Sequence, residues 1–213
     1  MLSLSLGSGN WREEMWIEIF DRAKKRGKIV DTRLGEHEFQ YALINPQDGY
    51  GRDRVSTFGQ HYDYTGSTVT FWIKDAEKEG RVGLHEGGLA FVLERSLPRR
   101  DFADYIGLHE HAEAQYHPEG NVYVNDAERE VHGHGCKTEL GEVLKRDNEF
   151  IDAYANWLVG STKASKNPER GYFARAIPDF LDVIREGRLS PTKVLAEFKL
   201  QLDKGYHLHI SAD

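Results

Sequence analysis

Apolar residues recur at intervals of three and four between residues 11 and 26. This spacing puts them on one face of a helix and predicts an amphipathic α-helix over residues 11–26. Asn10 suits the position before that helix, because a short polar side chain caps the first amide groups, and Gly27 suits its end. The residues before it, 1–10, are expected to form a flexible start.

After this helix the pattern changes to an alternation of apolar and polar residues and to short apolar runs, which are typical of β-strands. The segments with these patterns are residues 39–43, 69–73, 82–84 and 89–93. The last two flank Gly87 and Gly88, a pair that favours a tight turn. Together they predict a small antiparallel sheet over residues 28–95.

Beyond Pro98 the hydrophobic period becomes 3.6 residues, which indicates helices separated by short breaks. The expected helices cover residues 99–116, 126–146, 148–158, 171–186 and 191–204. The fold class is therefore expected to be α+β, with an N-terminal helix, a small antiparallel sheet and a helical C-terminal half. Residues 11–160 are expected to form the α+β core, and residues 161–213 a helical extension packed on it.

The composition is typical of a water-soluble globular protein, with 213 residues of which 39% are hydrophobic and 30% charged. No apolar run approaches the roughly 18 residues of a membrane-spanning helix. The first residues lack the basic start and cleavage site of a signal peptide. The single cysteine, Cys136, excludes an intramolecular disulfide and fits a reducing compartment. We therefore expect a cytoplasmic protein without a membrane segment.

Charge points to one part of the chain. The net charge of −7 disfavours binding to nucleic-acid phosphates. Residues 101–150 hold twelve acidic and only four basic residues, together with five of the ten histidines. These histidines are His109, His111, His117, His132 and His134. No Gly-x-Ser-x-Gly motif marks a serine hydrolase, so this acidic, histidine-rich window is the candidate for a functional site.

The helix expected at 99–116 carries polar residues on its apolar face. On a helical wheel His109 lies at the centre of the stripe formed by Phe102, Tyr105 and Ile106, and Glu113 lies one turn further along the same face. A buried carboxylate is costly without a partner. A metal ion would supply one, since imidazole and carboxylate at positions i and i+4 reach one point.

The segment His109 to Glu113 resembles the active-site helix of zincin-type metallopeptidases, whose HExxH motif holds two zinc-binding histidines and a glutamate base. Here the motif reads HExxE. The resemblance implies that His109 and Glu113 bind zinc and that Glu110 is the general base of a metal-dependent hydrolase. The substrate would be a peptide or protein. The order of helix, small sheet and second helix is also similar to that of a minimal zincin domain.

In zincins a third ligand comes from further along the chain, often from the next helix. In the helix expected at 126–146, His134 falls on the face traced by Ala127, Val131 and Thr138, whereas His132 points away from it. His134 is therefore the preferred third ligand. The alternatives are His132, His117 and Glu139, the last two also as partners that hold a ligand in place.

A structural interpretation stands beside the metal site. A buried histidine and glutamate can satisfy each other in a core, and a metal can serve folding alone. The alternative function is thus a non-catalytic interaction or structural protein. The sequence leaves the substrate, the metal and the oligomeric state open.

Overall fold

The computed structural model describes residues 11–45, 82–86, 88–116 and 125–205. The flexible start expected at 1–10, the strand expected at 69–73 and the candidate ligand His117 lie outside this range. Within it the fold is α+β, as predicted: an N-terminal helix, a small sheet and a helical C-terminal half. None of the helices it describes is both long and apolar enough to cross a membrane.

The first half consists of α1 (Trp11–Lys25), β1 (Ile29–Leu34), β2 (His37–Ile44), β3 (Gly83–Glu86) and β4 (Leu89–Leu93). The second half consists of α3 (Ala103–Tyr116), α4 (Asn125–Val143), α5 (Asn148–Ala164), α6 (Tyr172–Ala176), α7 (Phe180–Glu186) and α8 (Pro191–Asp203). Short 3₁₀ turns lie at Glu94–Ser96, Arg100–Phe102 and Pro168–Arg170.

The sheet is mixed rather than antiparallel throughout. Its strand order is β1-β2-β4-β3, with antiparallel pairs at both edges and a parallel pair, β2 with β4, in the centre. Parallel pairing needs a long connection, and the chain between Ile44 and Gly83 provides the length for one. A strand shows the same alternation of apolar and polar residues in a parallel and in an antiparallel pair. The sequence pattern therefore could not distinguish parallel from antiparallel pairing.

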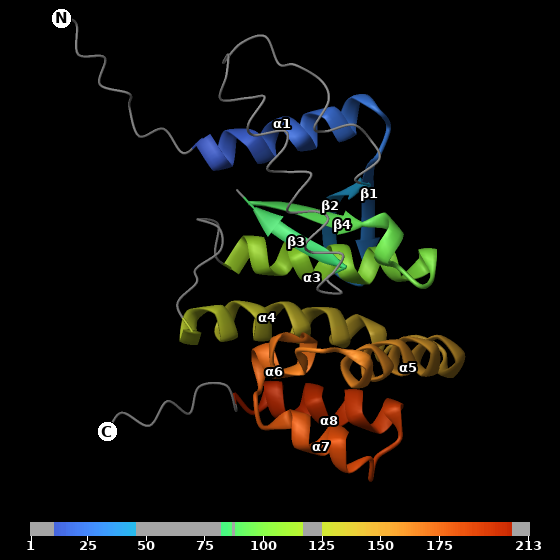
Figure 1. Ribbon diagram of the computed structural model, residues 1–213. Helices are drawn as coiled ribbons and strands as arrows, with labels where there is room; N and C mark the ends of the chain where they lie inside the picture. The colour runs from blue at the N-terminus through green and yellow to red at the C-terminus, as the bar shows by residue number, and fades with distance from the viewer. Residues whose placement is uncertain (1–10, 46–81, 87, 117–124, 206–213) are drawn as a thin grey trace, which may run out of the picture.

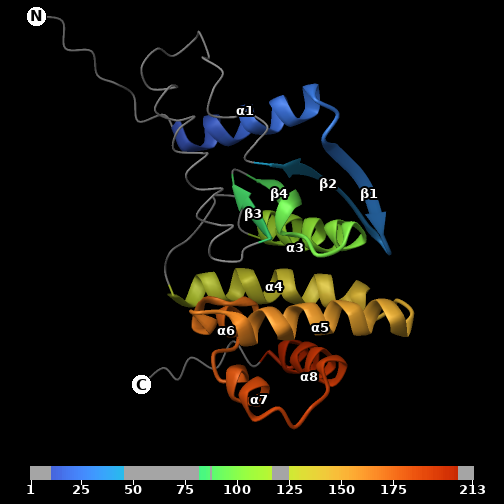
Figure 2. The same cartoon turned by 45° about the vertical axis from the view of Figure 1, so that its right-hand side comes forward.

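The elements stack in layers. Figures 1 and 2 show α1 on one side of the sheet, α3 on the other, α4 beneath α3, and α5 to α8 beyond α4. Between α1 and the sheet lies a small apolar core of Ile19, Ala23, Ala42, Ile44, Phe91 and Leu93. The opposite face of the sheet meets α3, so that α3 is enclosed between the sheet and α4.

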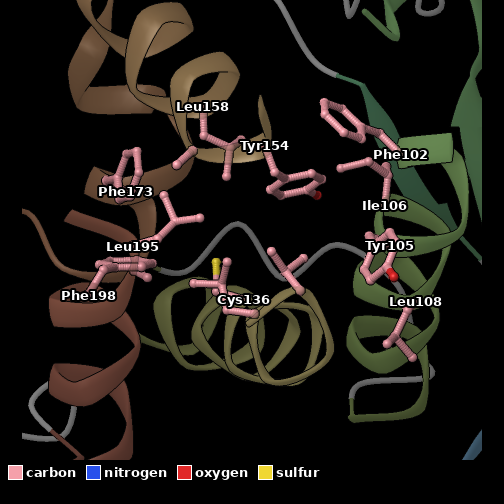
Figure 3. Packing of buried hydrophobic residues seen from close by; sticks show 14 of the residues in the cluster. Phe102, Tyr105, Ile106, Leu108, Cys136, Tyr154, Leu158, Phe173, Leu195 and Phe198 are labelled. Atoms are coloured by element: carbon pink, nitrogen blue, oxygen red, sulfur yellow. The ribbon is translucent and has the colours of Figure 1, made fainter. Parts of the chain in front are cut away.

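A second, larger core runs from α3 through α4 to the C-terminal helices. Figure 3 shows it from Phe102 and Tyr105 on one side, past Cys136 and Tyr154, to Phe198 of α8 on the other. The helices after residue 164 pack on α4 and α5. The boundary expected at residue 160 therefore falls inside α5, and one cluster of buried side chains extends across it.

The helix expected at 171–186 is divided into α6 and α7. Ile177, which precedes Pro178, has φ −133° and ψ 94°, an extended conformation. The proline ring excludes the helical conformation at the residue before it, which ends α6 and redirects the chain. This break leaves α6 as a short element lying against α4.

Candidate metal centre

A cluster of buried polar side chains lies where α3, α4, β3 and α6 meet. Helix α3 contributes His109, Glu110 and Glu113, helix α4 contributes His132 and Glu139, and strand β3 contributes His85. All six side chains are buried, and Glu110 is the most exposed of them at 8%. Since buried ionisable groups are rare without partners, the contacts among these six define what the cluster can do.

One carboxylate oxygen lies between two imidazoles. Glu113 Oε1 is 2.8 Å from His109 Nε2 and 2.7 Å from His132 Nδ1, and the two nitrogens are 3.2 Å apart. His109 and Glu113 meet because they are one turn apart on α3. His132 completes the triangle from α4. Three atoms that can each bind a metal thus converge at one point.

The outward nitrogens of both histidines face acceptors. His132 Nε2 lies 2.9 Å from the main-chain carbonyl oxygen of Tyr172. A carbonyl can only accept, so His132 donates from Nε2 and its Nδ1 keeps a lone pair when the ring is neutral. His109 Nδ1 lies 2.7 Å from Glu139 Oε2. Metal-binding histidines are typically held in this way, by a carboxylate or a carbonyl behind the ring.

Glu139 is itself held by two tyrosines. The hydroxyl of Tyr154 donates to Glu139 Oε1, and that of Tyr172 donates to Oε2 at 2.9 Å. The Glu139 carboxylate thus lies in contact with two hydroxyl donors and with His109 Nδ1. Tyr172, at the start of α6, supports both histidines, one through its carbonyl and the other through Glu139.

The second oxygen of Glu113 faces a different partner. Glu113 Oε2 lies 2.7 Å from Nδ1 of His85, and the same nitrogen is 3.4 Å from Glu110 Oε2. His85 is therefore placed between two carboxylates of α3. Residues His85, Glu110 and Glu113 form one group that could hold a metal ion, and His109, His132 and Cys136 form another beside it.

Burial and the neighbouring side chains together set the pKa values of these groups. Burial lowers the pKa of His132 to about 4, and the positive charge of Arg175 contributes. Burial alone would also lower the pKa of His85, but hydrogen bonds to Glu110 and Glu113 outweigh it and raise this pKa to about 9. The pKa of Glu113 would rise on burial, yet the surrounding histidines, His109 foremost, hold it well below its usual range.

Two glycines let the backbone close on the cluster. A Cβ at Gly135 of α4 would lie 2.7 Å from Glu113 Cγ and 3.0 Å from His109 Nε2. A Cβ at Gly83 of β3 would lie 2.6 Å from Glu110 Oε1. The contacts of 2.7 Å at Gly135 and 2.6 Å at Gly83 are shorter than real Cβ contacts, so any larger residue at either position would displace the polar groups. The glycines explain how α4 and β3 approach α3 so closely.

The structure brings together three of the four site residues expected from the sequence. His109, Glu110 and Glu113 lie in the cluster, whereas His134 is exposed on α4 and stacks on Tyr116 with ring centroids 4.7 Å apart. His132, an alternative from the sequence, occupies the place proposed for His134. Glu139 lies behind His109 rather than at the point of convergence.

The replacement of His134 by His132 follows from which face of α4 is buried. The face chosen from the sequence included Thr138, which is only half-buried and donates its hydroxyl to the His134 carbonyl. The buried face instead runs through Cys136, Leu140 and Val143. His132 lies one turn before Cys136 and shares that face, so weighting the apolar residues alone would have selected it.

The thiol of Cys136 is 3.5 Å from His132 Nε2, but the proton of that nitrogen faces the Tyr172 carbonyl, so the two do not offer lone pairs to one ion.

The sequence pattern did not predict that His85 would lie in the cluster. His85 shares a strand face with Gly83, and this face carries no hydrophobic pattern.

Comparison of the chain with protein-family models, with curated proteins and with solved structures gave no significant match.

Proposed function

We propose that His109, Glu113 and His132 bind a divalent metal ion, most suitably zinc, and that the chain is a metal-dependent hydrolase acting on a peptide or protein. The observation that carries the proposal is the triangle of His109 Nε2, Glu113 Oε1 and His132 Nδ1, with sides of 2.8, 2.7 and 3.2 Å. Two imidazoles and one carboxylate are a known ligand set of catalytic zinc.

A cation resolves the contacts within this triangle. The histidines hold the pKa of Glu113 well below its usual range, so this carboxylate has no proton to donate. Protons alone then satisfy both nitrogens against Glu113 Oε1 only if His109 and His132 are cationic at once, and a pKa of about 4 makes His132 neutral near pH 7. A neutral Nδ1 then directs its lone pair at a carboxylate oxygen 2.7 Å away. One divalent ion is attractive to all three atoms.

The distances suit such an ion. Donor atoms of a tetrahedral zinc site with bonds of about 2.0–2.1 Å lie about 3.3 Å apart. The three atoms here are 2.7 to 3.2 Å apart, so a small outward movement of the side chains is enough. The carbonyl of Tyr172 and the carboxylate of Glu139 already orient the two rings.

His109, Glu113 and His132 would hold a zinc ion through three protein ligands and would leave it one position for water. The ion would supply hydrolytic chemistry by lowering the pKa of that water toward 7. Glu110 adjoins His109 on α3 and has the most exposed carboxylate of the cluster. Both features support the proposal that Glu110 is the base that accepts a proton from water. His85 Nδ1, 3.4 Å from Glu110 Oε2, holds this carboxylate in place.

The metal site is tested by elemental analysis of untagged protein after loading with zinc and desalting. Wild type should retain zinc, His132→Ala should lose it, and His134→Ala should retain it. The last variant is a matched control, since it removes the same side chain from the exposed face of the same helix. Equal zinc in both variants, or none in wild type, would refute the site.

The hydrolase function is tested by cleavage of a fluorogenic unfolded protein by the zinc-loaded chain. Glu110→Gln should abolish turnover while the ion at His109 and His132 remains. Glu142→Gln is the control, because Glu142 is equally buried on α4 but pairs with Lys145 instead of with the cluster. Turnover unchanged in Glu110→Gln would exclude the base.

A structural metal is the second candidate function, and the burial of the cluster favours it. Both histidines and Glu113 are at most 4% exposed. In that case the ion stabilises the packing of α3 on α4 in an interaction or structural protein. The expected result would be a chelator that lowers the melting temperature, with no turnover in wild type.

A further inference from the structure

We propose that the centre holds a second divalent ion, bound by His85, Glu110 and Glu113, and that the Glu113 carboxylate bridges the two ions. This inference rests on the proposed function, because the bridge requires the first ion at His109 and His132. It adds to that function a two-metal site, an arrangement that stabilises both the attacking and the leaving atoms of a displacement.

The two oxygens of Glu113 point at different sets of donors. Oε1 faces His109 Nε2 and His132 Nδ1, and Oε2 faces His85 Nδ1 at 2.7 Å. A carboxylate that binds a single ion needs ligand atoms of that ion beside only one of its oxygens. An oxygen on each side is the arrangement of a bridging carboxylate, which suits ions about 3.5–4 Å apart.

The second position has three donors of its own. They are His85 Nδ1 from β3, Glu110 Oε2 from α3 and Glu113 Oε2, and all three side chains are buried. The nitrogen lies 2.7 Å from one carboxylate and 3.4 Å from the other. These separations again fit around one ion with bonds of about 2.0–2.2 Å, and imidazole with carboxylate suits zinc, manganese or iron.

Each position is closed by one glycine. Gly135 lies against Glu113 and His109 at the first position, and Gly83 lies against Glu110 at the second. The backbone of β3 thus approaches the Glu110 carboxylate from the side of Oε1, while Oε2 faces His85. Binding the second ion through Oε2 leaves Oε1 of Glu110 for the proton that the hydrolase proposal assigns to it.

The test is titration of the metal-free, full-length chain with Mn²⁺, followed by electron paramagnetic resonance and by metal analysis after desalting. We expect about two ions per wild-type chain and a spectrum split by coupling between them. His85→Ala should bind one ion and show the spectrum of isolated Mn²⁺. His37→Ala, which removes an exposed histidine at the start of β2, is the control and should match wild type.

The outcomes separate this inference from the proposed function. One uncoupled ion in wild type, retained in His85→Ala, would overturn the second position and leave the first. One ion that His85→Ala loses would make His85 a ligand of a single ion and would overturn the bridge. No ion in wild type would overturn both proposals. The wild-type spectrum decides even if His85→Ala fails to fold.

Discussion

At the scale of single residues, Gly135 sets the distance between α4 and the ligands on α3. Its missing side chain makes room for Glu113 and His109, whereas Gly141 on the same helix has no such neighbour. A Cβ at Gly141 would lie 3.7 Å from Lys199 Cε, an ordinary contact. The same substitution at these two positions should therefore have opposite effects.

We expect Gly135→Ala to lose metal binding and to lower the free energy of unfolding. The better helix propensity of alanine, about 0.5–1 kcal/mol, is outweighed by overpacking of about 1–3 kcal/mol. Gly141→Ala should raise stability by about 0.5–1 kcal/mol and leave the metal unchanged. Urea unfolding and zinc titration measure both effects, and equal stability of the two variants would contradict the close approach.

A second residue-scale prediction concerns pH and the metal-free protein. The pKa of His85 is raised from 6.5 to about 9 by Glu110 and Glu113. A raised pKa contributes stability that is fully present below pH 6.5 and is lost as the pH rises toward about 9. Chelator-treated protein should therefore become less stable over this interval in urea unfolding.

His85→Gln should flatten that dependence, because a glutamine has no proton to lose. His109, whose pKa is also raised, contributes in the same direction and leaves a residual slope. A metal-free wild type whose stability rises over this pH interval would show that His85 is not held between two carboxylates.

At the scale of elements, helix α4 contributes both a proposed metal ligand and a side chain that supports another. His132 lies near its middle and Glu139 two turns later, and both face α3 and α6. Glu139 accepts from His109 and from two tyrosines, so it holds the ring of a ligand without reaching the ion. Such supports typically change metal affinity about 10–100-fold when they are removed.

We therefore expect Glu139→Gln to weaken zinc binding about 10–100-fold in a competition titration with a chelator, with the helical circular dichroism retained. Asp147→Ala is the control. Asp147 accepts from the Phe150 amide at 2.9 Å and caps α5, so its loss should cost about 1 kcal/mol of stability without changing zinc affinity. Equal effects of the two variants on affinity would indicate general destabilisation.

At the scale of the whole molecule, the C-terminal helices belong to the same core as the helices that carry the candidate metal centre. Phe173, Leu195 and Phe198 are fully buried in the cluster that also contains Phe102 and Tyr154. Tyr172, at the start of α6, contacts His132 through its carbonyl and Glu139, the partner of His109, through its hydroxyl. Helices α6 and α8, which lie in the extension expected at 161–213, thus support the proposed site.

A chain ended at Ala164 should neither unfold cooperatively nor bind zinc, because it loses Tyr172 and exposes the apolar faces of α4 and α5. A chain ended at Gly205 keeps every element the structure describes and should retain both properties. Thermal melting and zinc analysis compare the two. A folded, zinc-binding chain ended at Ala164 would show that the core needs no extension.

The local pattern of hydrophobic and polar residues was enough to predict much of the secondary structure of this protein. Most of the described helices and strands followed from hydrophobic periods of 3.6 and two, because backbone geometry fixes which neighbouring side chains share a face. For the same reason the sequence was enough to place His109 and Glu113 together on the buried face of α3 and Glu110 beside them. It also sufficed to predict the break of the chain between sheet and helical half.

Only the tertiary structure decided which elements meet. The parallel pairing of β2 with β4, the choice of His132 over His134, and the arrival of His85 and Tyr172 depend on contacts between segments far apart in sequence. Periodicity says which side of an element is buried, but not which element covers it or how close it comes. Here that closeness depends on Gly83 and Gly135, whose role is visible only from the atoms they admit.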